Sequence, residues 1–138
     1  MTELAITASR NPPTVSAGRS AFALLRDLRS RFDWMNHGDC VGGDELLATY
    51  WAMIGGLLRA HDPDMDTLRA FVHSDERMPP LPYLARNRAM VDRAQALVAA
   101  PAGPEEQRSG TWSTIRYARR LGRPVAIVMP DGVVIKEG

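Results

Sequence analysis

Short apolar runs alternate with stretches of helical periodicity along this 138-residue chain, and that alternation constrains the fold more than any other feature. Strands that alternate with helices form an open, mostly parallel α/β sheet. We therefore expect a single domain over residues 1–138, with five or six strands, flanking helices and an antiparallel edge strand at the C-terminus. The predicted strands are Leu4–Ala8, Asp33–His37, Leu68–His73, Ala96–Ala100, Val125–Met129 and Val133–Ile135.

Helical spacing of apolar residues predicts four helices between these strands. Ser16 is the expected N-cap of the first helix and Thr111 that of the last, which ends before Gly122. The other two are predicted at Asp44–Leu58 and Leu84–Arg93. The Asp44–Leu58 helix is apolar on several sides, so it needs either a sheet and a helix or a sheet and a second subunit to cover it. We expect the second arrangement, a homodimer or higher homo-oligomer.

Composition excludes several classes of protein. Hydrophobic residues make up 45% and charged residues 24%, so a packed core is expected. The net charge of +1 argues against general nucleic-acid binding. The longest uncharged apolar stretch, Leu46–Leu58, is shorter than the ~20 residues of a membrane span. Cys40 is the only cysteine, which rules out an intrachain disulfide. A cytoplasmic protein is expected.

Arginine almost completely replaces lysine in this chain. Lys136 is the only lysine among the 17 basic residues. Several of the arginines follow the segment Ser74–Pro82, whose three prolines predict an extended loop. Codon bias would explain the arginines without any function. Alternatively, some guanidinium groups bind phosphate or carboxylate in bidentate geometry.

Four loops that follow predicted strands lie at the same edge of a parallel sheet, the edge where ligands bind in such folds. Glycines directly before two helices let the backbone N–H groups face an anion. The chain has neither a P-loop nor a G-x-G-x-x-G fingerprint. The residues expected to bind phosphate or ligand are Ser9, Arg10, Gly38, Asp39, Gly42, Gly43, Asp44, Arg86, Asn87, Arg88, Gly110 and Thr111.

These segments resemble the SLOG superfamily, a Rossmann-like group that includes the "lonely guy" phosphoribohydrolases and the DNA-processing protein A fold. The resemblance spans nearly the whole chain and is nearest to small stand-alone YpsA/YspA-like proteins. It implies a Rossmann-like domain that binds a nucleotide or a nucleotide-derived ligand at the sheet edge. We expect no cofactor to be required, and the near-zero net charge argues against nucleic acid as a partner despite the DNA-processing relatives.

The phosphoribohydrolases carry two site motifs, and this chain departs from both. The segment Arg86–Met90 is similar to Arg-Lys-x-x-Met, with Asn87 in place of Lys, and implies a catalytic role for Arg86. The segment Gly110–Thr114 is similar to Gly-Thr-x-x-Glu, but Thr114 stands at the position of the catalytic Glu. Cleavage of an N-glycosidic bond needs a base to position water, and threonine cannot supply one. The resemblance therefore favours a binding module or sensor, with a nucleotide phosphoribohydrolase as the alternative.

Other polar residues leave further alternatives. Asp39 is the candidate base if the chain is an enzyme, and Asp44 or Glu45 could take the same role. His37 and Cys40 lie close enough in sequence for a nucleophilic pair, although sequence neighbours on a turn rarely form one. No second Cys or His follows at metal-ligand spacing, so no metal site is expected.

Overall fold

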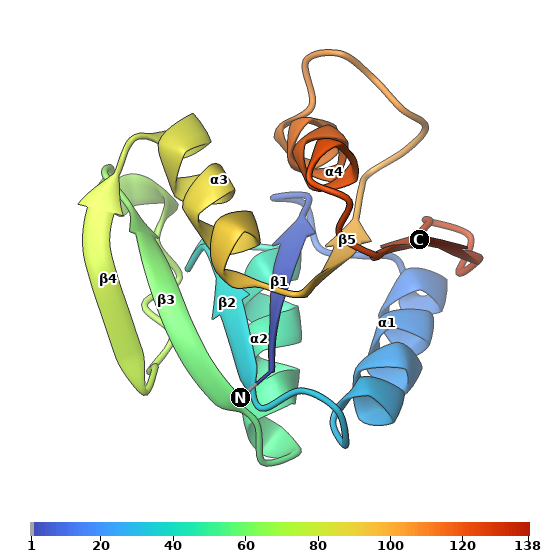
Figure 1. Cartoon of the computed structure of the whole chain (residues 1–138), viewed down its shortest axis with the longest axis horizontal. Helices are drawn as coiled ribbons and strands as arrows, with labels where there is room; N and C mark the ends of the chain where they lie inside the picture. The colour runs from blue at the N-terminus through green and yellow to red at the C-terminus, as the bar shows by residue number, and fades with distance from the viewer. Residues whose placement is uncertain (1) are drawn as a thin grey trace.

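Residues 2–138 are described by a computed structural model in which seven strands form one sheet in the order β4-β3-β2-β1-β5-β6-β7 (Figure 1). All neighbouring strands are parallel except β6 and β7, which are antiparallel. The strands are β1 (Glu3–Ala8), β2 (Trp34–His37), β3 (Leu57–Pro63), β4 (Glu76–Leu81), β5 (Ala96–Ala100), β6 (Val125–Val128) and β7 (Val134–Glu137). The expected mostly parallel α/β domain with an antiparallel edge strand is confirmed, with seven strands rather than five or six.

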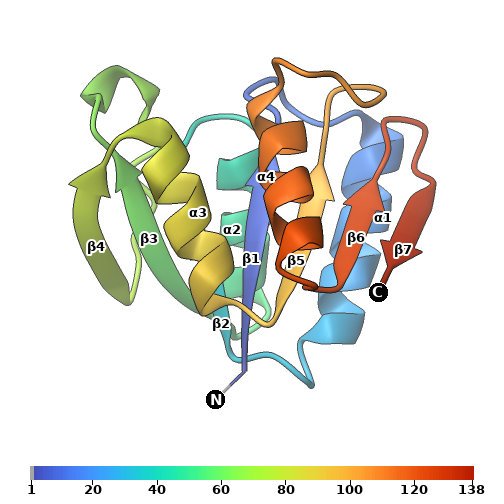
Figure 2. The same ribbon diagram turned by 45° about the horizontal axis from the view of Figure 1, so that its top comes forward.

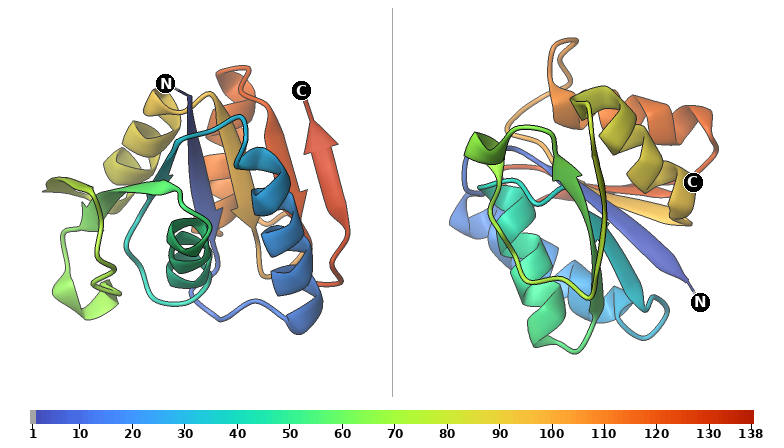
Figure 3. Two further views of the ribbon diagram at one scale, coloured as in Figure 1. Left: turned by 90° about the horizontal axis from the view of Figure 1, so that it is seen from below. Right: turned by 90° about the vertical axis from the view of Figure 1, so that its left-hand side faces the viewer.

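Four α-helices cover the two faces of the sheet. They are α1 (Val15–Leu28), α2 (Gly43–Met53), α3 (Tyr83–Arg93) and α4 (Gly110–Arg120), and a short 3-10 helix, η1, spans Asp66–Leu68. Figures 2 and 3 show α1 and α2 on one face and α3 and α4 on the other. The chain steps from β1 towards β4 with helices on one face and returns through α3 to β5 on the other. The carboxyl ends of β1 and β5 therefore form a topological switch point, where loops diverge and leave room for a ligand.

The helix that follows β2 is shorter than its apolar pattern predicts. It ends at Met53 instead of Leu58, because Gly55 adopts a φ of +89° and Gly56 packs directly against the indole of Trp51. Leu57 and the residues after it form β3, a strand absent from the sequence prediction. Charged and polar residues inside β3 hide it, since a buried strand is recognised by an uninterrupted apolar run.

The segment that follows β3 also differs from the prediction. Leu68–His73, predicted as a strand, is an irregular loop, and the strand lies later, at Glu76–Leu81, within the segment predicted as a loop. This strand, β4, is at the edge of the sheet and pairs only with β3. An edge strand tolerates prolines because one side of its backbone needs no partner, which accounts for Pro79 and Pro80 in β4.

Two helix caps lie two residues before the predicted ones. The Oγ1 of Thr14, not Ser16, accepts the N–H of Ala17 at 3.0 Å, and the Oγ of Ser109, not Thr111, accepts the N–H of Trp112 at 3.2 Å. The consequence for α4 is that Thr111 belongs to the first turn of the helix. Its side chain is 7% exposed.

Helix α2 is covered without a second subunit. Its fully buried residues Leu47, Ala48 and Trp51 pack in the core against the sheet, and Tyr50 stacks on Phe22 of α1 with ring centroids 4.1 Å apart. The second covering surface is therefore another helix. The apolar pattern of α2 no longer supports the expected homo-oligomer, because α1 covers the face that was assigned to a second subunit. Among the residues described, no helix has the length and apolar character needed to cross a membrane.

Candidate functional site

A hollow of about 420 Å³ opens at the carboxyl ends of β1 and β5, at the switch point of the sheet. Four residues predicted from sequence line it together: Ser9, Arg10, Gly110 and Thr111. The rest of its lining is Ala8, Tyr83, Ala102, Arg108 and Ser109. No acidic residue is among them. The side chains of Arg10 and Arg108 form no ion pair with any carboxylate of residues 2–138. The wall of this hollow is therefore electropositive.

The first turn of α4 adds hydrogen-bond donors to the hollow. The N–H groups of Gly110 and Thr111 have no acceptor within residues 2–138, whereas the next N–H, from Trp112, is capped by Ser109. No acidic residue occurs in this first turn. Free N–H groups at a helix N-terminus carry partial positive charge and suit an anion.

A smaller pocket of about 30 Å³ lies beside the hollow and shares Ala8, Arg10 and Tyr83 with it. Its cation is Arg86, which is only 3% exposed. One guanidinium nitrogen, Nη1, donates to the carbonyl oxygen of Gly38 at 2.6 Å and to that of His61 at 3.4 Å. The Nε of Arg86 is buried without a hydrogen-bond acceptor, and no ion pair within residues 2–138 involves Arg86. A buried guanidinium without a carboxylate is costly, so this arrangement suits an anionic ligand.

Asp44 lines the same small pocket, as predicted for a site residue. Its Oδ2 accepts the N–H of Gly38 at 2.7 Å and that of Cys40 at 3.3 Å. Burial raises the pKa of Asp44 to about 6, although the nearby charge of Arg86 and the two backbone N–H groups oppose that shift. The carboxyl group therefore titrates close to neutral pH, as a general base should.

The N-terminus of α2 is less suited to an anion than that of α4. The N–H of Gly43 already donates to the carbonyl oxygen of Ser9 at 3.0 Å, and Asp44 and Glu45 occupy the first turn. Gly42 is required for close packing, because a Cβ there would lie 1.9 Å from the carbonyl oxygen of Arg10. Gly42 and Gly43 thus bring the β1 loop and α2 together, and the N–H of Gly43 is not free to bind an anion.

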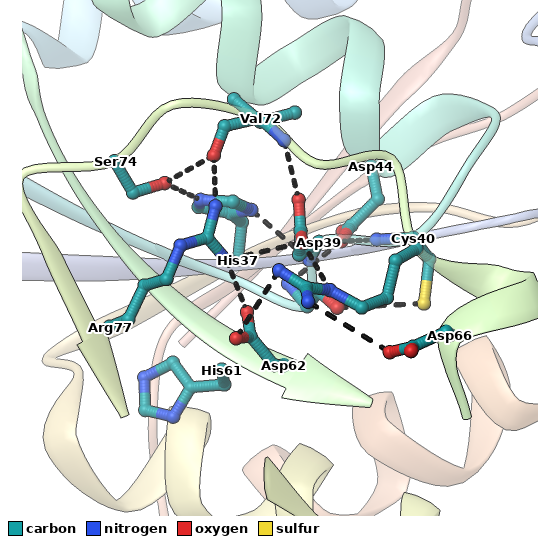
Figure 4. A network of polar contacts seen from close by, with 12 residues as sticks. His37, Asp39, Cys40, Asp44, His61, Asp62, Asp66, Val72, Ser74 and Arg77 are labelled. Carbon is teal, nitrogen blue, oxygen red and sulfur yellow. Dashed lines mark hydrogen bonds and ion pairs between the residues drawn. The ribbon is translucent and has the colours of Figure 1, made fainter. Parts of the chain in front are cut away.

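Asp39 lies in a cluster of ion pairs (Figure 4) and lines neither cavity. Its Oδ2 is 3.2 Å from Nε of Arg69 and 3.2 Å from Nη1 of Arg77, and its Oδ1 accepts the N–H of Val72 at 2.8 Å. Asp62 pairs with the same two arginines. Every carboxylate oxygen of Asp39 is occupied, so we do not retain Asp39 as a base or a ligand contact.

Arg88 and Thr114 also point away from the hollow. Arg88 is exposed, and its guanidinium lies 5.3 Å from the ring centre of Tyr117. Thr114 is 2% exposed, and its Oγ1 donates to the carbonyl oxygen of Gly110 at 3.0 Å. Asn87 of the same motif does line the small pocket. Two of the three residues of the segment Arg86–Arg88 therefore line the small pocket.

His37 and Cys40 do not form a nucleophilic pair. The Nδ1 of His37 accepts the N–H of Asp39 at 3.1 Å, so the proton is on Nε2 and is donated to Oγ of Ser74, 2.9 Å away. Burial lowers the pKa of His37 to about 4, which keeps the ring neutral. The Sγ of Cys40 instead lies 3.5 Å from Nη1 of Arg86, in the small pocket, and burial raises the pKa of its thiol.

Two site residues were missed by the sequence analysis. Tyr83 borders both cavities, and Arg108 borders the hollow. Tyr83 follows Pro82 and precedes Arg86 by three residues, so one helical turn places both at the same end of α3. Arg108 lies in the long β5–α4 loop. No periodic pattern exists there from which the direction of its side chain could be predicted. No group of three His, Cys, Asp or Glu side chains within residues 2–138 could hold a metal ion.

No protein-family model matches the sequence, and no curated protein matches it either. Solved structures do match the fold. A structural genomics target, TM1055, superposes with a TM-score of 0.70 at 22% identity, covering 91% of this chain and 72% of that one. The molybdenum cofactor binding protein of Rippkaea orientalis gives 0.74 at 19% identity, covering 93% and 76%.

DNA processing protein A of Helicobacter pylori gives a TM-score of 0.63 at 19% identity, over 91% of this chain and 64% of that one. The predicted resemblance to the group that includes the DNA-processing protein A fold is thereby confirmed for the fold. At these identities the matches describe architecture alone. Residues 2–138 thus form an α/β domain whose fold matches those of TM1055, the molybdenum cofactor binding protein and DNA processing protein A.

Proposed function

We propose that this protein binds a phosphorylated small molecule, a nucleotide or a nucleotide derivative, at the carboxyl edge of its sheet and acts as a binding module or sensor. The observation that carries the proposal is Arg86, a guanidinium that is 3% exposed and has no carboxylate partner among the described residues. An anionic ligand would supply the missing charge. The solved structures of like fold include a protein described as binding the molybdenum cofactor, which supports a small-molecule ligand here.

The proposed ligand contacts divide between the two cavities. Free N–H groups of Gly110 and Thr111, with Arg10 and Arg108, bind one anionic group in the hollow. Arg86 binds a second charged or strongly polar group in the small pocket. The hollow of about 420 Å³ lies within the usual size range of small-molecule sites.

Thermal unfolding with a panel of nucleoside 5′-monophosphates, inorganic phosphate and a single-stranded oligonucleotide tests this proposal. We expect phosphorylated ligands to raise the Tm of the wild type and to leave that of Arg86→Met unchanged, because bound ligand stabilises only a folded state that can bind it. Arg88→Ala is the matched control and should respond like the wild type. A shift with the oligonucleotide alone would contradict a small-molecule ligand and favour nucleic-acid binding.

A nucleotide phosphoribohydrolase is the second candidate, and Asp44 is the observation that favours it. This carboxyl lines the pocket of Arg86 and has a pKa raised by burial to about 6, so it is poised to accept a proton from water. Thr114, by contrast, donates its hydroxyl to a backbone carbonyl and faces away from the hollow.

Chromatography of free base after incubation with the same nucleotides separates the two candidates. A rise in Tm without base release supports the binding module, whereas base release that Asp44→Asn abolishes supports the hydrolase. If no phosphorylated compound raises the Tm or is cleaved, both candidates are wrong. A homodimer remains a prediction, which sedimentation equilibrium of the purified chain would decide.

A further inference from the structure

The proposed ligand faces a steric obstacle on its way to Arg86. The pocket at this guanidinium has a volume of only about 30 Å³, less than a tenth of that of the adjoining hollow. The adjoining hollow of about 420 Å³ is large enough, but Arg86 does not line it. An anion that enters the hollow therefore reaches Arg86 only after a side chain between the two cavities moves.

Tyr83 is the side chain in that position. It borders both cavities, and its ring centre lies 5.2 Å from the guanidinium carbon of Arg86. On its other side the hydroxyl meets the N-terminus of α4, since a Cβ on Gly110 would lie 1.8 Å from that oxygen. The ring thus extends from the first residue of α3 to the first residue of α4 and closes the small pocket from the hollow.

The surroundings of Tyr83 allow this ring to move. The side chain is 40% exposed, and its hydroxyl has no hydrogen-bond partner within residues 2–138. Arg10, the other side chain shared by the two cavities, is exposed and unpaired, so it offers no fixed wall. Rotation of one tyrosine joins the two cavities into one space that contains Arg86 and the free N–H groups of α4.

We infer that Tyr83 is the gate of the proposed ligand site: its ring covers Arg86 in the free protein and swings aside when a phosphorylated ligand enters. This inference rests on the proposed function for the identity of the ligand. On this inference, Tyr83 also determines which compounds bind. Displacing the ring costs free energy, so a ligand reaches Arg86 only if its contacts in the hollow offset that cost. Gly110 sets the closed position, since any side chain there would push the hydroxyl away.

Cys40 provides the means to test the gate. It is the only cysteine of the chain, and its Sγ lies in the small pocket beside Arg86. The rate of alkylation by iodoacetamide, measured across a range of pH, separates the reactivity of the thiol from its accessibility. The midpoint of the profile reports the pKa of the thiol, and the limiting rate at high pH reports access to the pocket.

The variants are Tyr83→Ala, which removes the ring, and Gly110→Ala, whose Cβ pushes against the flexible end of the ring. We expect each to raise the limiting alkylation rate several-fold. In the Tyr83→Ala background, Gly110→Ala should add nothing, because its effect acts only through the tyrosine. Gly103→Ala is the matched control in the preceding loop. A Cβ there meets no atom within 4 Å, so the rate should stay that of the wild type.

An unchanged limiting rate in both single variants, with circular dichroism showing that they fold, would overturn the gate. So would a rise on Gly110→Ala that is equally large when Tyr83 is alanine. Protection of Cys40 by inorganic phosphate tests the proposed function separately. If phosphate slows alkylation in the wild type while the variants leave the limiting rate unchanged, the anion site stands and the gate is wrong. If the variants behave as expected but phosphate gives no protection, the gate stands and the proposed ligand is wrong.

Discussion

Arginines on either side of the β2 loop differ in how deeply they are buried and in how their charge is balanced. On the α2 side of β2 and β3, Arg69 and Arg77 both pair with the carboxylates of Asp39 and Asp62. In the small pocket, Arg86 is more deeply buried than either and donates only to carbonyl oxygens and to the sulfur of Cys40. Both arginines of the first group form ion pairs, whereas Arg86 forms none within residues 2–138, although the carboxyl group of Asp44 lines the same pocket.

If the proposed function holds, this difference separates a structural charge from a ligand-binding one. The four charges of the paired group attach the β3–β4 loop to the end of β2, and Figure 4 shows Arg77 and Asp62 beside Asp39 in that group. Arg86 forms no ion pair, so its burial costs free energy in the unbound protein. A bound anion would offset that cost and so gain affinity. A buried cation without a counter-ion is therefore a better indicator of a ligand site than a cluster of opposite charges.

The largest effect is expected when the paired group is broken. Asp39→Asn removes a fully buried carboxylate from two guanidinium groups and should lower the free energy of unfolding by about 3–5 kcal/mol, measured by urea denaturation. Asparagine suits this position because Asp39 has a φ of +52°, a region that asparagine tolerates. The amide oxygen also retains an acceptor for the N–H of Val72, so the loss reports the charge.

Asp66→Asn is the matched control for that experiment. Asp66 lies 3.9 Å from the same Arg69, but its side chain is 88% exposed, so its removal should change the free energy of unfolding by less than about 1 kcal/mol. A loss after Asp39→Asn no larger than that of the control would mean that the paired group does not hold the loop in place.

The next effect concerns pH and lies in the unpaired pocket. Because the pKa of Asp44 in the folded protein, about 6, exceeds its ordinary value of 3.8, folding favours the protonated carboxyl. Its stabilising contribution is complete below about pH 4 and is lost as the pH rises to about 6, a change of about 3 kcal/mol at 1.36 kcal/mol per pKa unit. Asp44→Asn should therefore be more stable than the wild type at pH 7 and equal to it near pH 4.

Subtraction of the wild-type curve from that of the variant isolates Asp44 from the buried histidines. Burial lowers the pKa of His37 to about 4 and that of His61 to about 3. Both proteins therefore lose folding stability as the pH falls below about 6.5, because these rings are protonated more readily in the unfolded chain. A difference curve that stays flat between pH 4 and 6 would show that the pKa of Asp44 is not raised.

The glycines and the purely apolar runs were enough to predict the sheet edge where the hollow opens. Leu4–Ala8 and Ala96–Ala100 are buried strands without a charge, and the hollow opens where these two strands end. The sequence could not reveal β3, because Arg59, His61 and Asp62 interrupt its apolar pattern and become acceptable only after neighbours on β1, β2 and β4 supply partners. Tertiary pairing overrides local pattern there.

The roles of the two acidic candidates show the same limit within the site. Asp39, in the loop after β2, and Asp44, in the first turn of α2, are five residues apart and have the same chemistry. They differ because Arg69 and Arg77, distant in sequence, reach the first, whereas the second faces Arg86 and two backbone N–H groups. Only the positions of β3, β4 and their connecting loop decide which carboxylate is structural, and those were the segments that the sequence pattern described wrongly.

A smaller effect on stability, but a complete effect on binding, is expected for Arg86→Met. Methionine fills much of the same volume without a charge. The relief of an unpaired buried cation should offset the lost hydrogen bonds to Gly38 and His61, leaving the free energy of unfolding within about 1–2 kcal/mol of the wild type. Binding of inorganic phosphate, measured by calorimetry, should disappear. A loss of stability as large as that of Asp39→Asn would instead make Arg86 a structural cation like Arg69.

The smallest effect is expected for Arg88, two residues further along α3. Its guanidinium lies 5.3 Å from the ring centre of Tyr117 at an exposed site, and Arg120 lies 5.6 Å from the same ring. Such a contact is worth about 0.5–1 kcal/mol, and the second arginine retains part of it, so Arg88→Ala should lower the free energy of unfolding by less than about 1 kcal/mol. Binding of phosphate should be unchanged, because Arg88 borders neither cavity. A weaker affinity in this variant would show that the outer surface of α3 takes part in binding, and burial without a partner would then no longer distinguish the arginines that bind from those that do not.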